Sequence, residues 1–169
     1  MKKIILGLAI FAFSFANAQA PLETGGIQLN AGFGSSNWGT PVYVGLDFGV
    51  VENFTLGAEL SYQSYNQNGG PYDYKSTIYG IQVNGNYHFN ELLNIPSKWD
   101  VYGGANINYY SWTTKYDGVK VTNYSDSDDF GLGLQIGGRY FFTDNFGINL
   151  QLGGGNVTSG AKLGITYKF

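Results

Sequence analysis

Alternation of apolar and polar residues with period two is the dominant pattern of this chain, and it recurs in eight segments. Between residues 42 and 50, valine, leucine and phenylalanine occupy the even positions, while tyrosine, glycine and aspartate occupy the odd ones. Such alternation predicts a β-strand with one apolar and one polar face. The eight segments are, in order, residues 26–34, 42–50, 54–65, 77–89, 101–112, 130–142, 146–152 and 162–169.

The connections between these segments differ in length in a regular way. Tight turns at 51–53 and 143–145 and a link at 90–100 alternate with four longer connections, and an even number of strands brings both termini to one side. The pattern predicts an all-β fold, an eight-stranded antiparallel up-and-down transmembrane β-barrel with four extracellular loops. The seventh segment is the shortest, and we expect its tail, 153–155, to continue the strand. The longer connections are residues 35–41, 66–76, 113–129 and 155–160.

The composition agrees with a barrel that faces lipid. Charged residues make up 12% of the chain and aromatic residues 17%, with 26 glycines, whereas a soluble domain has about 25% charged residues. After the amino-terminal segment the chain has no run of about 18 apolar residues that would predict a membrane helix. The soluble alternative is a secreted, lipocalin-like ligand carrier, which would need a far more charged outer face.

The amino terminus has the pattern of a secretory signal peptide. Lys2 and Lys3 precede an apolar run at 4–13, and small residues follow, with a cleavage site after Ala18 or Ala20. A transmembrane anchor is the alternative, but the run is shorter than the ~20 residues that a spanning helix needs. The absence of cysteine excludes disulfides and thiolate sites. The predicted organisation is a signal peptide at 1–18, a short segment at 19–24 and a barrel domain at 25–169.

The carboxyl terminus carries the most specific signal. The chain ends on an aromatic residue that continues the apolar face of its last segment, and this stretch resembles the sorting signal read by the outer-membrane barrel-assembly machinery. That family pattern has a polar residue, a glycine, an aromatic residue and a terminal aromatic residue at fixed spacing. The matching residues are Lys162, Gly164, Tyr167 and Phe169.

Strand number, loop asymmetry and this signature together make residues 25–169 similar to the small eight-stranded outer-membrane barrels of the OmpA/OmpX type. The link at 90–100 is longer than the turns usual in that family. The resemblance implies export to the outer membrane of a Gram-negative bacterium. It also implies contact with outer-membrane lipid and lipopolysaccharide, and the barrel-assembly machinery as a partner during biogenesis.

Charged residues on the predicted inward faces are candidates for a lumen charge network. An eight-stranded barrel is just wide enough for side chains to fill its interior. A lone charge there is costly, so we expect acids and bases to pair, Glu59 with either Arg139 or Lys162. The network is then either a static polar plug or a gate that exchanges partners and passes ions. Its members are Asp47, Glu59, Arg139, Lys162 and Lys168.

The sequence predicts no enzyme, cofactor or metal site. The one histidine, His88, lies near the periplasmic end of the fourth segment, where we expect it to face the lumen and form hydrogen bonds. The run at 125–129 is rich in Ser and Asp but has no histidine nearby, which favours a solvated loop or a weak divalent-cation site. Phosphate-binding, dinucleotide and zinc motifs are absent. A net charge of −3 without a basic cluster argues against nucleic acid.

Two functional classes remain. The first is a structural or surface-interaction barrel, whose tyrosine-rich loops suit contact with a surface protein partner. The second is a narrow porin-like channel for ions or small solutes. The loops carry no recognisable motif that would decide between them. The tyrosines in question are Tyr72, Tyr74, Tyr116 and Tyr124.

Overall fold

The structure, a computed structural model, describes residues 21–69, 72–116, 119–120 and 128–169. The predicted signal peptide and most of the Ser- and Asp-rich run lie outside these ranges. Within the described ranges, no helix is long and apolar enough to cross a membrane.

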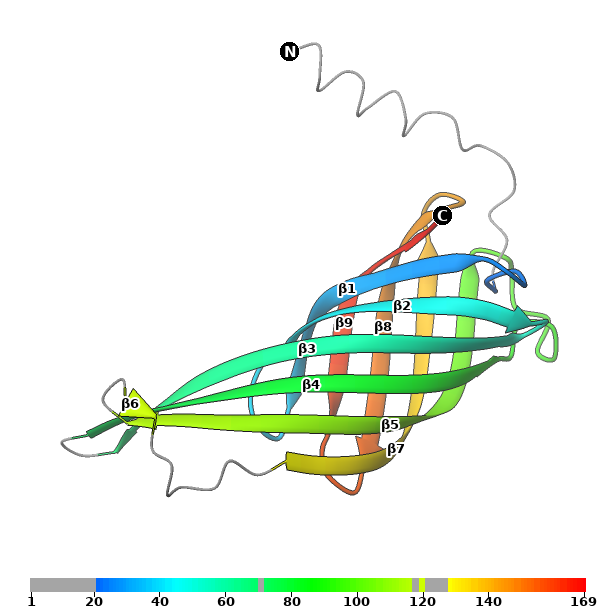
Figure 1. The fold of residues 1–169 in the computed structure, drawn as a ribbon. Coiled ribbons are helices and arrows are strands. Elements are labelled where there is room, and N and C mark those ends of the chain that lie inside the picture. Colours follow the sequence, from blue (N-terminus) through cyan, green and yellow to red (C-terminus); the bar gives the residue numbers. More distant parts are fainter. Residues whose placement is uncertain (1–20, 70–71, 117–118, 121–127) are drawn as a thin grey trace, which may run out of the picture.

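Eight long antiparallel strands close into a barrel, and a two-residue strand, β6, extends it beside β5 (Figure 1). The order is β4-β3-β2-β1-β9-β8-β7-β5, and β5 also pairs with β4, so the cylinder is complete. The predicted eight-stranded antiparallel barrel is therefore confirmed. The strands are β1 (Ile27–Ser36), β2 (Val42–Val51), β3 (Phe54–Gly69), β4 (Tyr72–His88), β5 (Trp99–Tyr116), β6 (Val119–Lys120), β7 (Asp128–Phe141), β8 (Phe146–Gly155) and β9 (Ser159–Lys168).

Pairing between β1 and β9 closes the barrel. It runs from Gln28 opposite Lys168 to Ser36 opposite Gly160. The β2–β3 turn, where Asn53 takes the left-handed conformation with φ 58°, lies at the same end of the barrel as Ile27 and Phe169. We call this the terminus end. We call the opposite end, which holds the β1–β2 and β8–β9 connections, the loop end.

The two faces of the barrel wall have the polarity that the alternation predicts. Buried side chains are mostly polar or charged, whereas large apolar side chains are exposed on the outside. In β7, for example, Leu134 is 70% exposed while the next residue, Gln135, is 6% exposed. A continuous apolar outer surface is stable only when something apolar covers it, and lipid does so in membrane barrels.

Three strands exceed the lengths that the sequence pattern predicts by the widest margin, and β9 also begins earlier than predicted, at Ser159. β3, β4 and β5 continue past the loop end of their neighbours as a tall wall (Figure 1), so the predicted loop at 66–76 is mostly a hairpin. Pairing along it continues to Gly69 opposite Tyr72. The extensions are rich in Ser, Thr, Tyr and Asn, and outside an apolar environment a strand needs no apolar face, so its alternation fades. The tail at 153–155 does continue β8, as expected.

Aromatic rings gather at the terminus end, mostly on the outer face. Ring pairs there have centroids 5.2 Å apart for Tyr87 and Phe89, 4.7 Å for Trp99 and Tyr140, and 5.2 Å for Tyr167 and Phe169. Amphipathic rings favour the headgroup level of a bilayer. These pairs therefore mark one edge of the apolar band.

A charge in the middle of this band should be costly. Leu134 lies at the centre of β7, so Leu134→Lys is expected to lower the free energy of unfolding in lipid vesicles by about 2–4 kcal/mol. Leu134→Ala is the matched control and should lose much less. Urea-induced unfolding in vesicles measures both. Equal stability of the lysine and alanine variants would show that this face does not contact hydrocarbon.

Candidate functional site in the barrel lumen

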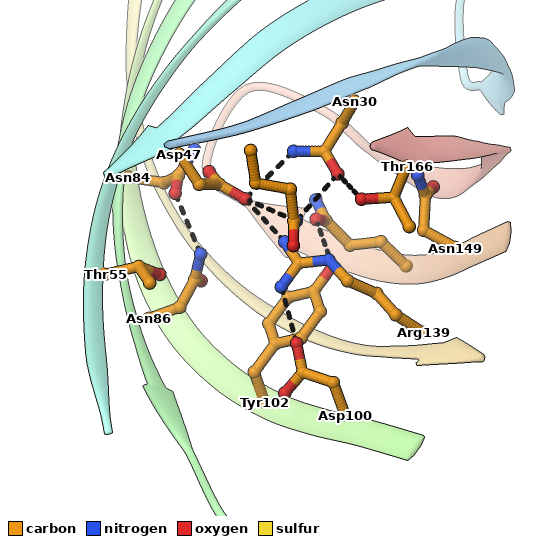
Figure 2. Close-up of polar contacts among 12 residues, drawn as sticks. Asn30, Asp47, Thr55, Asn84, Asn86, Asp100, Tyr102, Arg139, Asn149 and Thr166 are labelled. Atoms are coloured by element: carbon orange, nitrogen blue, oxygen red, sulfur yellow. Dashed lines mark hydrogen bonds and ion pairs between the residues drawn. The ribbon is translucent and has the colours of Figure 1, made fainter. Parts of the chain in front are cut away.

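The guanidinium of Arg139 lies between two carboxylates in the terminus half of the lumen (Figure 2). Its Nη1 donates to Asp100 Oδ2 at 2.7 Å, and its Nη2 donates to Asp47 Oδ2 at 2.5 Å. Its Cζ lies 4.3 Å from the centroid of the Tyr102 ring. All four side chains are buried. Asp100 is the direct cross-strand neighbour of Arg139, whereas Asp47 reaches it from across the lumen.

The second oxygen of Asp100 continues the network. Asp100 Oδ1 lies 2.6 Å from His88 Nδ1, and His88 Nε2 lies 3.0 Å from Thr55 Oγ1. Hydroxyl, imidazole and carboxylate are connected here in the order of a hydrolase triad. Thr55 and His88 are both 0% exposed, however, and Arg139 shares the carboxylate. A substrate has no path to this hydroxyl, so the geometry supports a positioning network.

Every long strand contributes a side chain to this layer. Asn30 of β1 donates to Asp47 at 2.9 Å and accepts from Thr166 of β9 at 2.9 Å. In β8, Asn149 lies directly opposite Arg139 and accepts a hydrogen bond from the Tyr43 hydroxyl at 2.7 Å. We call this layer the lumen plug. It consists of Asn30, Asp47, Thr55, His88, Asp100, Tyr102, Arg139, Asn149 and Thr166.

Glycines make room for the large side chains of the plug. A Cβ atom on Gly137 would overlap the Tyr102 ring, and one on Gly57 would overlap Asp47 Oδ1. Both glycines face the lumen, where an eight-stranded barrel has little free volume. Their place in the strands therefore follows from close packing inside the barrel.

A second ion pair crosses the lumen nearer the loop end. Lys162 Nζ of β9 lies 2.5 Å from Glu59 Oε1 of β3 and donates to Gln82 Oε1 at 3.3 Å. β3 and β9 are separated by β2 and β1, so this contact spans the interior. The sequence predicted that Glu59 pairs with either Arg139 or Lys162, and in the structure it pairs with Lys162.

Cavities lie on either side of this ion pair. The loop-end cavity has a volume of about 80 Å³ and opens toward solvent, and the cavity toward the plug has a volume of about 20 Å³. Tyr43, Glu59 and Gln151 line both, so their layer separates the two. We call the loop-end cavity the cup. Its lining includes Trp38, Tyr43, Glu59, Asn108, Tyr110, Thr158 and Lys162.

Not all of the candidate network residues come together. Asp47 and Arg139 belong to the plug, and Glu59 and Lys162 form the upper pair, but Lys168 Nζ lies 4.2 Å from the centroid of the Phe141 ring near the terminus end.

The sequence pattern missed Asp100, which carries two contacts of the plug. The link at 90–100 was predicted to include it, but β5 begins at Trp99. A signal was available, since Asp100 lies two residues before the inward-facing Tyr102 and so shares its face.

Two residues of the carboxyl-terminal signature, Gly164 and Phe169, differ in how closely they are packed. A Cβ atom on Gly164 would overlap the Ala31 backbone and crowd the Tyr43 hydroxyl. Phe169, by contrast, is 73% exposed. Packing alone therefore accounts for the glycine but not for the terminal aromatic residue.

Comparisons with known proteins agree with this geometry. A family model described as "Outer membrane protein beta-barrel domain" matches residues 5–169. No protein of curated function matches the chain in sequence.

Solved structures of small outer-membrane barrels share the fold. The amino-terminal β-barrel domain of Pseudomonas aeruginosa OprF matches with TM-score 0.58 and 16% identity, over 86% of this chain and 98% of that one. OprG of Pseudomonas aeruginosa matches with TM-score 0.60 and 14% identity, over 88% and 97%. Ail, the attachment invasion locus protein of Yersinia pestis, matches with TM-score 0.56 and 12% identity, over 86% and 99%. At such identities the likeness shows the fold alone.

Removal of the central cation should destabilise the barrel. Arg139→Leu leaves Asp47 and Asp100 buried without their shared partner, and we expect a loss of about 3–5 kcal/mol in the free energy of unfolding. Adding Asp47→Asn and Asp100→Asn to the same chain should recover most of that loss, because the unpaired charges are gone. Urea titration in vesicles measures both. A triple variant no more stable than Arg139→Leu would contradict the charge-pairing account.

Proposed function

The chain belongs to the outer membrane protein β-barrel family, and from that premise we propose that it is a structural and surface-interaction protein with a closed lumen. In this proposal the mature chain resides in the outer membrane of a Gram-negative bacterium after export by its amino-terminal signal peptide. Outer-membrane lipid and lipopolysaccharide surround the barrel. The loop end faces the exterior, and the terminus end faces the periplasm.

The lumen plug is the observation that carries this proposal. Side chains from all eight long strands meet there, and Arg139, Asp100 and His88 are at most 3% exposed. A solute pathway would have to break several charge-assisted hydrogen bonds at once, each of which is stronger than a neutral one. The same burial of His88 and Thr55 supports the proposal that the protein is not an enzyme.

The shape of the loop end supports a role in surface contact. The extended β3–β4–β5 wall carries Tyr72, Tyr74 and Tyr116 beyond the other strands. Tyrosine is enriched at protein interfaces because it offers a large ring and a polar hydroxyl. One barrel of this fold, Ail, is named for attachment and invasion. We propose a surface protein partner that binds this wall.

Solute flux tests the closed lumen. In liposome-swelling assays the purified protein should pass glucose and small ions no faster than empty liposomes do, because the plug fills the lumen. The triple variant Asp47→Asn, Asp100→Asn and Arg139→Leu is the matched comparison for a disrupted plug. Flux through the unmodified protein well above the empty-liposome level would overturn the proposal.

A narrow channel is the second candidate function, and one observation favours it. The layer of Tyr43, Glu59 and Gln151 separates two cavities, and Lys162 already contacts both Glu59 and Gln82. Exchange of that lysine between partners would join the cavities. Planar-bilayer conductance of Glu59→Ala decides the matter: if it equals that of the unmodified protein, the gate does not exist.

The terminal aromatic residue is proposed to contact the barrel-assembly machinery. Phe169→Ala should lower the amount of folded protein in cells severalfold but leave refolding into vesicles unchanged, because the exposed ring contributes little packing. Phe142→Ala, which removes another exposed aromatic ring at the terminus end, is the control and should leave assembly in cells intact. Heat-modifiable gel migration counts folded barrels. An equal defect in both variants, or a refolding defect in Phe169→Ala, would contradict the signal.

A further inference from the structure

The cup is built around an aromatic cluster. Trp38, from the β1–β2 connection, has its ring centroid 5.0 Å from Tyr110 and 4.7 Å from Trp112, with interplanar angles of 85° and 73°. Its backbone nitrogen donates to Ser36 Oγ at 3.2 Å, which fixes the turn. Trp38 and Tyr110 line the cup itself. The cavity therefore has an aromatic wall, which is typical of small-molecule sites.

A chain of side-chain amides leads from the plug side of the lumen to the cup. Asn108 Nδ2 donates to Asn106 Oδ1 at 2.6 Å, and Asn106 Nδ2 donates to Gln135 Oε1 at 2.8 Å. Gln135 Nε2 then donates to Asn86 Oδ1 at 2.6 Å, and Asn86 Nδ2 to Asn84 Oδ1 at 2.9 Å. Amides linked in one direction polarise one another. The carbonyl at the open end, Asn108 Oδ1, is thereby a strengthened acceptor.

That carbonyl oxygen has no partner among the described residues, although Asn108 is only 7% exposed and lines the cup. The buried Thr158 Oγ1, also on a cup-lining residue, and the buried Trp112 Nε1 are likewise unpartnered within the described part of the chain. Each such atom costs about 1–3 kcal/mol. Asn108 and Thr158 line the cup, and the Trp112 ring contacts Trp38 of its aromatic wall. These unpartnered atoms indicate a site that a hydrogen-bonding ligand completes.

The charge of the cup limits what that ligand is. Glu59 and Lys162 pair with each other in its floor, so the described lining residues offer no unpaired ion to attract a charged ligand. A purely apolar ligand would cover the aromatic wall but leave the Asn108 carbonyl and the Thr158 hydroxyl unpaired. The ligand should therefore be uncharged, with one apolar face and several hydroxyl groups.

We propose that the cup binds an uncharged sugar ring. The C–H face of a pyranose packs on Trp38 and Tyr110, one sugar hydroxyl donates to Asn108 Oδ1, and another bonds to Thr158 Oγ1. This site goes beyond the structural and surface-contact role, since it requires neither transport nor a protein partner. It would take single sugar units of glycans that reach the loop end.

Intrinsic fluorescence provides the test. In a Trp99→Phe background, which removes the one tryptophan at the terminus end, only Trp38 and Trp112 report. The purified barrel is titrated with the methyl glycosides of glucose, galactose, mannose and N-acetylglucosamine, and with glucuronate as the charged counterpart. We expect saturable binding of at least one neutral glycoside with a dissociation constant on the order of 1 mM, and weaker binding of glucuronate.

Two variants distinguish a specific binding site from nonspecific contact. Trp38→Ala should weaken sugar binding by about tenfold or more. Thr158→Val, which keeps the shape of the side chain but removes its hydroxyl, should also weaken it. Calorimetry measures sugar binding to Trp38→Ala. Heat-modifiable migration verifies that each variant is folded. The proposal is overturned if no neutral glycoside binds, if glucuronate binds as well as or better than the neutral glycosides, or if folded Trp38→Ala and Thr158→Val both bind unchanged. None of these outcomes depends on whether the lumen passes solutes.

Discussion

The pairing of Arg139 with Asp47 and Asp100 is the interaction on which the rest of the lumen depends. All three side chains are buried, so an unpaired charge among them would cost several kcal/mol. Arg139 of β7 and Asp100 of β5 lie on neighbouring strands, whereas Asp47 of β2 lies on the opposite wall. A slip of any of these strands by one residue would turn its charge toward lipid. Charge pairing therefore favours the observed register of β2, β5 and β7.

The two halves of the lumen differ in how densely they are filled and in how completely their polar groups are paired. The plug half is filled by polar groups that satisfy one another, with His88 and Thr55 fully buried. The cup half is open and aromatic, and it keeps polar atoms unpartnered within the described residues. The Glu59–Lys162 pair stands between them. The proposed display and binding roles need only the open half, whereas conduction would need a path through the filled one.

The sequence could predict most of the wall and part of the lumen. Period-two alternation identified all eight long strands and which residues face inward, because lipid and lumen impose opposite polarity on alternate positions. It missed Asp100, since the link before β5 has no alternation. It also missed the extensions of β3, β4 and β5, which leave the apolar band. The Arg139–Asp47 contact crosses the lumen between strands far apart in the sequence, so no local pattern could have specified it.

Thiol labelling tests the central claim most directly, because the chain has no cysteine of its own. Ser61 lines the cup, and Thr55 lies on the same face of β3 inside the plug and is 0% exposed. A membrane-impermeant maleimide is added at the loop end of the folded protein in sealed vesicles. The plug account predicts rapid labelling of Ser61→Cys and labelling of Thr55→Cys only after unfolding. Equal labelling rates for the two folded variants would contradict a closed lumen.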